Sequence, residues 1–285
     1  MIAQHRDAYP LRLMCRVLAV TPSGFYAWQR RDPSARYQDD TLLGVQIAAF
    51  HRRSRRRYGS PRIWKDLREE AGRRVSRKRV ARVMREAGLV GTPRRRFRVT
   101  TQADPRQAPA PNQLARQFTV SQPNRVWAAD VTYLATAAGW CYLAVVLDLC
   151  SRQVVGWALS ARLDRQLALT ALGRALARRR PPWGLLHHSD RGKEYTSRDY
   201  QAQLAQAGIA CSMSRRGDCW DNAVVESFFA TLKRELVADA CWPTLAEATT
   251  DLAQYLDGWY NVHRRHSTLG YLSPAAYEAR LTAAA

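Results

Sequence analysis

Three acidic residues in the second half of the chain have types and spacings that suit chemistry on phosphate groups. Asp130 interrupts the apolar run RVWAADVTYL, Asp190 ends the apolar run LLHHSD, and Glu226 follows Asp190 with 35 residues between them. A carboxylate inside an alternating strand is costly unless it is paired or bound to a metal ion. We therefore predict that the three carboxylates meet at one site.

Each acid taken alone has an ordinary structural explanation. Asp130 could belong to a buried ion pair or lie at a sheet edge, and Asp190 stands in Ser-Asp-Arg-Gly, a common turn. A helical glutamate such as Glu226 is usually solvated. Convergence on one edge of a sheet, where α/β proteins place their ligands, favours the shared site instead.

Three carboxylates in one place repel each other and raise at least one pKa, which destabilises the fold. Divalent cations that prefer oxygen ligands remove this repulsion, so the set indicates Mg²⁺, for which Mn²⁺ can substitute. Two such ions roughly 4 Å apart can clamp a phosphate and activate a water or a 3′-hydroxyl. The predicted chemistry is in-line attack on a phosphodiester.

Polar residues around the acids extend the predicted site. Lys233 lies about two helical turns after Glu226, and so on the same helix face, as a phosphate contact. Asn222, one turn before Glu226, is placed to orient the glutamate or to touch the substrate. His188 shares strand parity with Asp190, and it either lines the site or is a hydrogen-bonded core histidine.

Two further acids are predicted to have structural roles. Asp148 should face a turn with Ser151 and Arg152 as partners. Asp221 should cap the helix that carries Glu226. Neither acid is assigned to the site.

The elements that position these residues follow a change of hydrophobic period after residue 124. Apolar, β-branched and aromatic runs joined by short polar turns predict an antiparallel meander, after which helices and strands alternate. The predicted strands are 125–136, 140–151, 152–161, 183–190 and 209–214, and the predicted helices are 164–180, 197–208 and the one that carries Glu226. This order predicts an α/β protein whose mixed five-stranded sheet is flanked by helices, as a ribonuclease-H-like core requires.

The formal net charge of +21 and the pI near 10.6 indicate a polyanionic partner, because so basic a surface repels itself unless it is neutralised. A membrane surface is the second candidate, but no apolar run approaches the roughly 20 residues that span a bilayer. Asp7, Arg12 and Arg16 interrupt any apolar core that a signal peptide would need. We expect a cytoplasmic protein that binds DNA.

Residues 52–98 hold most of the excess charge. They contain 19 Lys/Arg and 4 Asp/Glu, which places 15 of the 21 net positive charges in this segment. A solvated or disordered tail is the alternative, but apolar residues at helical spacing favour a folded module that contacts phosphates. The residues expected to contact DNA are Arg55, Arg56, Arg57, Arg62, Arg77, Lys78 and Arg79.

The remaining segments divide the chain. Residues 9–30 have the outline of a helix-turn-helix, in which Thr21 can cap the second helix and Pro22 suits its first position. Residues 99–123 lose periodicity and gather prolines, which is typical of a linker. The predicted parts are an N-terminal helical segment (1–50), a basic helical DNA-binding module (51–98), a linker (99–123), a catalytic core (124–240) and a C-terminal helical extension (241–285).

The six cysteines are scattered with no C-x-x-C pair, and we expect them to be reduced core residues. His263 and His266 form an H-x-x-H, but no cysteine pair accompanies them, so a zinc site is not expected. Metal binding is expected through the carboxylates instead.

Several longer motifs in the chain are specific in both composition and spacing. In the second half they are W-x-x-D-x-T-Y at 127–133, H-S-D-R-G-x-x-Y at 188–195, D-N-A-x-x-E-S-F-F-x-x-L-K-x-E at 221–235 and Y-N-x-x-R-x-H-S-x-L-G-Y-x-S-P at 260–274. Upstream they are Y-G-S-P-R-I at 58–63 and R-V-A-R-V-M-R-E-A-G-L at 79–89. Together they resemble the DDE transposases of bacterial insertion sequences, which have a retroviral-integrase-type core behind a helical DNA-binding module.

The resemblance implies that Asp130, Asp190 and Glu226 are a catalytic triad, with two magnesium ions as cofactors. The implied reaction is DNA strand cleavage and strand transfer at the ends of the element. The implied partners are DNA, both element ends and target, and further copies of the chain assembled on it. Glu194, like Lys193 and Asp218, stands where the family often has an uncharged polar residue.

The chain looks like the downstream-frame part of a fusion, so the upstream-frame protein is a further expected partner, and the main end-recognising domain would lie there. A rival interpretation from another class is a non-catalytic DNA-binding regulator whose core has become inert. The intact acids favour the enzyme.

Overall fold

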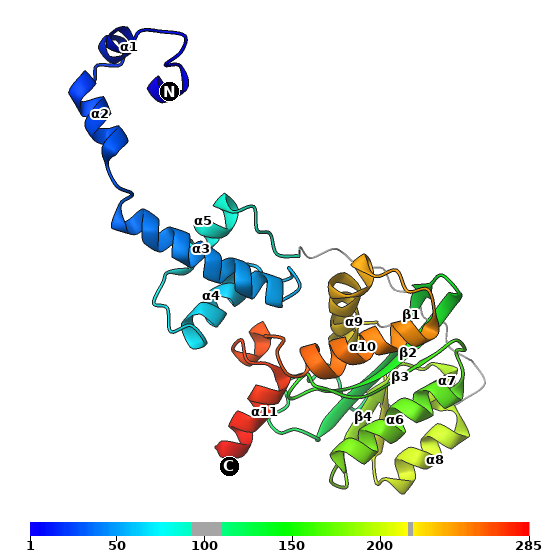
Figure 1. The fold of residues 1–285 in the computed structure, drawn as a ribbon. Helices are drawn as coiled ribbons and strands as arrows, with labels where there is room; N and C mark the ends of the chain where they lie inside the picture. The colour runs from blue at the N-terminus through cyan, green and yellow to red at the C-terminus, as the bar shows by residue number, and fades with distance from the viewer. Residues whose placement is uncertain (93–109, 216–218, 285) are drawn as a thin grey trace.

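The computed structural model describes residues 1–92, 110–215 and 219–284. The end of the basic module (93–98), the first part of the expected linker (99–109) and Asp218 lie outside the described residues. Figure 1 shows the chain passing from N-terminal helices, through a helical module, to a larger core that contains the sheet.

A five-stranded mixed sheet forms the centre of the core, with the strand order β3-β2-β1-β4-β5. The strands are β1 (Val126–Thr136), β2 (Gly139–Asp148), β3 (Val154–Ser160), β4 (Leu186–Ser189) and β5 (Ala210–Met213). β2 pairs antiparallel with both β1 and β3, whereas β4 runs parallel to both β1 and β5. The predicted meander and the ribonuclease-H-like mixed sheet are confirmed.

The two faces of the sheet carry separate apolar cores, because side chains alternate along each strand. On β2, Leu143 and Val145 belong to one core, and Ala144 and Val146 belong to the other. The helices over the face of Ala144 are α6 (Arg165–Arg179), α7 (Lys193–Thr196) and α8 (Arg198–Gln206), and those over the face of Leu143 are α9 (Ala223–Glu235) and α10 (Leu245–Ala253). The sheet is therefore covered on both sides, as predicted.

Strand β3 lies so close to helix α6 that one position requires glycine. A Cβ atom at Gly156 would collide with the carbonyl oxygen of Ala171 and come within 2.7 Å of the amide nitrogen of Ala175. Across the same interface Arg174 donates a hydrogen bond to the carbonyl oxygen of Trp157 at 2.9 Å. The missing side chain at Gly156 thus sets the distance between strand and helix.

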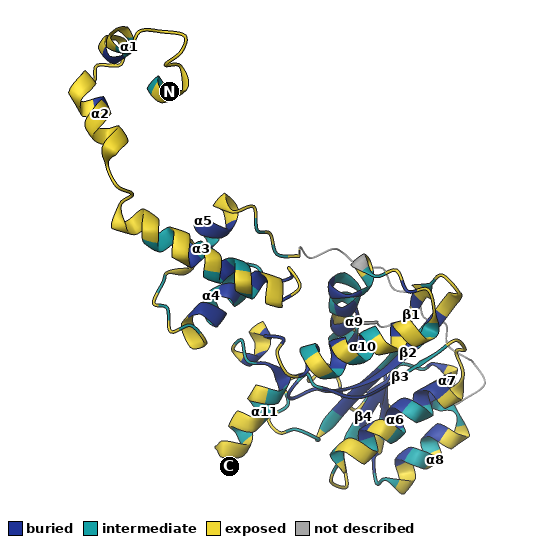
Figure 2. Cartoon of the chain, in the orientation of Figure 1, coloured by how far each residue is buried: buried dark blue, intermediate teal, exposed yellow. Residues whose placement is uncertain are grey.

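The N-terminal part of the chain is helical. Its elements are η1 (Ile2–Gln4), α1 (Leu11–Val17), α2 (Pro22–Arg30), α3 (Ala35–Arg53), α4 (Ser60–Glu69) and α5 (Arg77–Glu86). The predicted cap is present: the Thr21 hydroxyl accepts a hydrogen bond from the amide of Gly24 at 3.0 Å, and Pro22 opens the helix. Figure 2 shows α1 and α2 mostly exposed, whereas the inner faces of α3, α4 and α5 are buried.

Helix α3 crosses the expected boundary between residues 50 and 51. Its Leu43 and Ile47 are fully buried in one core with Ile63 and Leu67 of α4 and Val80 of α5. A single apolar core over three helices is what holds so small a unit together. The folded module therefore includes α3.

The remaining elements follow β5 and complete the chain. They are η2 (Cys219–Asn222), η3 (Val237–Asp239), the π-helix η4 (Gln254–Tyr260), η5 (Ser267–Leu269) and α11 (Pro274–Ala283). Across the ranges that the structure describes, no helix combines the length and the apolar character needed to cross a membrane.

The C-terminal segment joins the helical module to the core through a buried ionic contact. The guanidinium of Arg265 donates hydrogen bonds to the carboxylates of Asp66, Glu69 and Glu70, which lie along α4 and at its end. The amide of Arg265 donates to the Tyr58 hydroxyl at 2.8 Å. Three acids of the basic module are therefore used for docking.

We expect Gly156→Ala to lower the free energy of unfolding by about 1–3 kcal/mol, because the new methyl group overpacks against the backbone of α6. Gly173→Ala is the matched control, since a Cβ there would have the Gln203 amide nitrogen, at 3.5 Å, as its nearest neighbour outside the helix. It should be neutral or stabilise the protein by up to about 1 kcal/mol. Urea unfolding followed by circular dichroism measures both, and equal stability of the two variants would contradict the close approach.

Candidate active site

The parallel pairing of β1 with β4 places Asp130 beside Asp190. The register pairs Ala128 with His188. Asp130 and Asp190 each lie two residues further along, so they share strand parity and reach the same edge of the sheet. Two of the three predicted acids are thus brought together by the sheet itself.

Helix α9 carries the third acid, Glu226, in its first turn. At the start of the helix, the side-chain amide of Asn222 donates a hydrogen bond to the carbonyl oxygen of Ala129 at 3.1 Å. Ala129 directly precedes Asp130, so this bond fixes the beginning of α9 at the level of the first acid. Asn222 therefore ties the start of the helix to β1, whereas its predicted contact with Glu226 or with the substrate stays a prediction.

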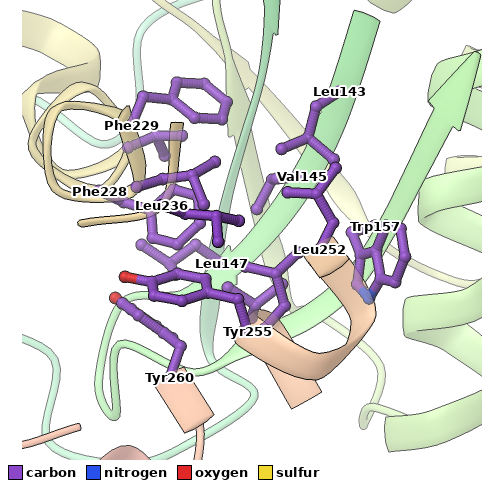
Figure 3. Packing of buried hydrophobic residues seen from close by; sticks show 14 of the residues in the cluster. Leu143, Val145, Leu147, Trp157, Phe228, Phe229, Leu236, Leu252, Tyr255 and Tyr260 are labelled. Atoms are coloured by element: carbon purple, nitrogen blue, oxygen red, sulfur yellow. The ribbon is translucent and has the colours of Figure 1, made fainter. Parts of the chain in front are cut away.

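The far end of α9 is held by apolar packing and by a buried ion pair. Figure 3 shows Phe228 and Phe229 of the helix among the side chains of β2 and the C-terminal segment, and full burial of such a side chain contributes about 1.5–3 kcal/mol. In the last turn, Arg264 donates hydrogen bonds to both oxygens of Glu235 at 2.9 and 2.8 Å, and the Tyr255 hydroxyl donates another at 2.9 Å. Burial opposes the ionisation of Glu235, but the charge of Arg264 outweighs it and lowers the pKa.

The acids influence one another electrostatically. Burial raises the pKa of Asp130 well above its ordinary value, and the carboxylates of Asp190, Glu226 and Glu194 raise it further. Burial also raises the pKa of Asp190 and that of Glu226. Without a cation, ionisation of these groups in the folded protein therefore carries a cost in stability.

Glu194 lies close to these acids. In the sequence it stands out only as an acid at a position where the family that the chain resembles often has an uncharged polar residue. It is buried, and burial together with the charge of Asp190 raises its pKa. A Cβ atom at Gly192 would lie 2.6 Å from Glu194 Oε1 and 3.0 Å from Asp190 Oδ1, so the glycine leaves room for both carboxylates. The position of Glu194, four residues after Asp190, is the sequence signal that identifies it.

The side chains that gather here suit a hard divalent cation, because they offer oxygen atoms as donors. Two buried polar atoms near them, the Tyr195 hydroxyl and Asn222 Oδ1, have no hydrogen-bond partner within the described residues. In those same ranges, no group of three or more His, Cys, Asp or Glu side chains is arranged to hold an ion. Asp190 and Glu226 lie near enough to Asp130 to raise its pKa, and the binding of a metal ion by the three acids stays a prediction.

Lys233 lies on the same helix as Glu226, as predicted. Its ammonium group stands 4.6 Å from the ring centre of Tyr133 on β1. Burial lowers the pKa of Lys233, and the charge of Asp130 partly restores it. The ammonium is thus within the electrostatic reach of the acids, and its contact with a phosphate stays a prediction.

His188 is a core residue, which corrects the expected DNA contact. The ring is fully buried, with Nδ1 2.9 Å from the Ser212 hydroxyl and Nε2 3.1 Å from the Ser214 hydroxyl. Burial lowers its pKa to about 4, so the ring is neutral at pH 7. The hydrogen-bonded core histidine, the other alternative from the sequence, describes this residue.

The prediction that Asp221 caps α9 is wrong. Its carboxylate is buried and accepts hydrogen bonds from the guanidinium groups of Arg215 and Arg116, which lower its pKa. The predicted turn role of Asp148 is confirmed for Ser151, whose amide and hydroxyl donate hydrogen bonds to the carboxylate, whereas the guanidinium of Arg152 donates to the carbonyl oxygen of Phe118. Asp221 thus fastens the loop before α9, and Asp148 closes the turn after β2.

Three of the predicted DNA contacts are occupied within the protein, and these are corrected. Arg57 is buried, with its guanidinium 5.4 Å from the ring centre of Tyr255. Arg62 donates a hydrogen bond to the carbonyl oxygen of Arg265 at 2.9 Å. Arg79 donates to two acids of α3 at 2.7 Å. These arginines hold the module together and attach it to the core.

The other four predicted contacts, Arg55, Arg56, Arg77 and Lys78, are exposed. The guanidinium of Arg77 lies 5.9 Å from the ring centre of Trp64, which leaves its charge at the surface of α5. Exposed cations on a folded helical module are what phosphate binding requires. Contact of these four with DNA stays a prediction.

Three family models match consecutive parts of the chain. An HTH-like domain matches residues 38–97, which include α4 and α5. One integrase core domain matches residues 120–219, which contain Asp130 and Asp190, and a second integrase core domain matches residues 207–274, which contain Glu226. The matches therefore fall on the helical module and on the sheet with its acids.

Similar full-length proteins come from insertion sequences. The chain is 42% identical over 279 residues to the transposase InsF for insertion sequence IS3fB of Escherichia coli (strain K12), an alignment that covers 97% of this chain and 96% of that protein. It is 42% identical over 267 residues to the insertion element IS600 uncharacterized 31 kDa protein of Shigella sonnei, covering 94% and 98%. Among solved structures, the HTLV-2 integrase catalytic core domain in complex with magnesium matches 55% of this chain and 97% of that chain, with 18% identity and a TM-score of 0.41.

We expect metal-free Asp130→Asn to be at least as stable as the wild type at pH 7. Because the folded-state pKa of Asp130 is raised, the wild type loses stability as the pH rises from the ordinary pKa of an aspartate toward the raised value, and the amide removes this loss. Added Mn²⁺ should raise the melting temperature of the wild type more than that of the variant. Thermal melts in EDTA and in Mn²⁺ at equal ionic strength measure both effects.

Asp199→Asn is the control for these melts, because Asp199 is an exposed carboxylate on α8 that pairs with Arg165. It should respond to Mn²⁺ as the wild type does. If Asp130→Asn were less stable than the wild type in EDTA by more than about 2 kcal/mol, Asp130 would be the stabilising partner of a cationic side chain, contrary to the metal-site assignment.

We expect the double variant Arg77→Gln, Lys78→Gln to bind random duplex DNA more weakly. The slope of log Kobs against log salt should become shallower by about 0.9 for each phosphate that the variant no longer neutralises. Arg79→Gln is the matched control on the same helix, because that guanidinium is held by acids of α3, and it should leave the slope unchanged. Fluorescence anisotropy over a salt series measures the slopes, and an equal change in both variants would refute the division into exposed and occupied cations.

Proposed function

Since the chain belongs to the family of bacterial insertion-sequence transposases with an integrase core and an HTH-like domain, we propose that it is a polynucleotidyl transferase. Its reaction is the cleavage of DNA strands at the ends of an insertion sequence and their transfer to target DNA. The observation that supports this most is the β1–β4 register that sets Asp130 beside Asp190, together with the effect of the Asp190 and Glu226 charges, which raise the pKa of Asp130.

The three carboxylates would hold two Mg²⁺ ions, for which Mn²⁺ can substitute. Bound cations of this kind supply activation of the attacking hydroxyl and stabilisation of the leaving oxygen in phosphodiester exchange. The contribution of the chain is to hold the carboxylates in place. The β1–β4 register sets Asp130 beside Asp190, and the Asn222 hydrogen bond sets the height of the helix that carries Glu226.

Cationic side chains orient the substrate in this proposal. Lys233 binds a phosphate beside the acids, where partial burial strengthens a charge-assisted hydrogen bond. The exposed cations of α5 and of the turn before α4 hold duplex DNA by its backbone. Such contacts fix the position of the DNA without reading its bases.

Insertion of an element requires both of its ends, whereas each chain offers one cluster of acids. We therefore infer that two or more copies assemble on the DNA. The upstream-frame protein expected from the sequence would join this assembly by recognising the ends.

The proposal is tested by incubating labelled element-end DNA with the protein, alone and with its upstream-frame partner, in Mg²⁺ or Mn²⁺. We expect nicked and joined products from the wild type and a loss of about a hundredfold or more for Asp130→Asn, since changes even in residues that only support metal ligands cost about 10- to 100-fold. Gel analysis of the labelled strands measures the products.

Asp199→Asn again serves as the control, and it should match the wild type because Asp199 lies exposed on α8. If the wild type binds the ends yet gives no product with either metal, the enzyme proposal fails. The non-catalytic DNA-binding regulator would then be the better description.

A further inference from the structure

A cleft at the junction of the helical module and the core is lined by arginines. It has a volume of about 550 Å³, and its arginines are Arg62, Arg152, Arg234 and Arg264. No acidic side chain is among the described residues that line it. The rest of the lining comes from Thr92 of the module, the end of β2, α9 and the C-terminal segment, and on α9 it includes Val224 and Ser227, close to Glu226.

Two of these arginines keep part of the guanidinium without a partner. Arg152 donates to the carbonyl oxygen of Phe118 at 3.2 Å, while its Nη1 is buried with no acceptor in the described part of the chain. Arg234 has a long hydrogen bond of 3.5 Å to the Thr231 hydroxyl and lies 4.0 Å from Glu235, and its Nε is likewise buried with no acceptor in the ranges described. Buried donors without an acceptor are costly, and this cost favours the binding of a ligand that accepts hydrogen bonds.

Nearby acids offset only part of the positive charge of the cleft: the charge of Glu235 acts to raise the pKa of Arg62, and that of Asp148 acts to raise the pKa of Arg152. Glu235 lies behind Arg264, which takes both of its oxygens. Burial lowers the pKa of Arg62 and of Arg152, and the charge of Arg264 adds to the effect on Arg62. Burial and these three arginines lower the pKa of His266, which also lines the cleft, well below its ordinary value. The cleft therefore has the potential of an anion site.

We propose that this cleft binds a phosphate group of the DNA backbone, held by the guanidinium groups of Arg152 and Arg234. The inference rests on the proposed function, which makes DNA the polyanion that the chain holds. Planar guanidinium groups suit phosphate oxygens because they donate two hydrogen bonds in parallel. Helix α9 serves both sites, with Glu226 at the acids and Arg234 at the cleft, so one DNA strand can contact both.

The test compares Arg152→Gln and Arg234→Gln with Arg174→Gln. Arg174 is the matched control because, like Arg152, it donates one hydrogen bond to a backbone carbonyl, but it lies on α6 over the opposite face of the sheet. We expect each cleft variant to reduce the slope of log Kobs against log salt for duplex DNA by about 0.9, and to weaken binding about tenfold at the lowest salt. The control should keep the slope of the wild type.

Fluorescence anisotropy gives the slopes, and circular dichroism melts confirm that each variant is folded. If Arg152→Gln does not fold, Arg234→Gln carries the test alone, because its side chain is partly exposed and its hydrogen bond is weak. Slopes of both cleft variants equal to that of the wild type would overturn the proposal. The strand-transfer assay is separate from this measurement. If the wild type gave no joined product there, the proposed function would fail, but the salt slopes would still show whether the cleft binds DNA.

A free phosphate ion has the same chemistry as a backbone phosphate, so a second measurement separates the two sources. Melting temperatures are compared in sodium phosphate and in sodium chloride of equal ionic strength. A phosphate-specific rise that disappears in the cleft variants, with unchanged DNA slopes, would assign the cleft to small anions and overturn the DNA assignment. Reduced DNA slopes support it, whether or not the free ion also binds.

Discussion

The buried ion pair between Glu235 and Arg264 is the interaction on which the working parts of this protein depend. It fixes the last turn of α9 to the C-terminal segment, while the first turn is held against β1. Between these two anchors the helix presents Glu226 to the acids, Lys233 to their surroundings and Arg234 to the cleft. Removing one partner of such a pair leaves a buried unpaired charge and costs about 3–5 kcal/mol. The loss would displace Glu226, Lys233 and Arg234, because the same helix positions all three.

Some arginines in the helical module form ion pairs within the protein, and others remain exposed. The net charge alone does not distinguish these two groups. Asp39 and Asp40 of α3 bind Arg79 and also Arg73 and Arg82, so three guanidinium groups close the module on itself. The acids of α4 bind an arginine of the C-terminal segment instead of solvent. The surface that remains for DNA is therefore smaller than the count of basic residues suggests, and it is concentrated where α5 and the turn before α4 are exposed.

The parts of this structure that follow from local pattern could be predicted from the sequence. Period-two apolar runs give the meander, and the cost of burying a carboxylate points to Asp130. The parts that depend on distant partners could not be predicted. His188 is a core residue because two serines of the β5 segment reach its ring nitrogens, and Asp221 leaves the cap position because Arg116, about a hundred residues earlier in the chain, binds it. The sequence alone predicts Arg57 as a surface charge, whereas in the structure it is buried against Tyr255 of the C-terminal segment.

The contact of Arg265 with the acids of α4 has a consequence for where a DNA strand would be cut. It ties the module to the core, so the exposed cations of the module and the acids at the sheet edge lie a set distance apart. Under the proposed function, this fixed spacing would set the length of DNA between the contacts of the module and the phosphodiester that reacts. The bases at that position would then not need to be read, because the spacing alone would select the phosphodiester.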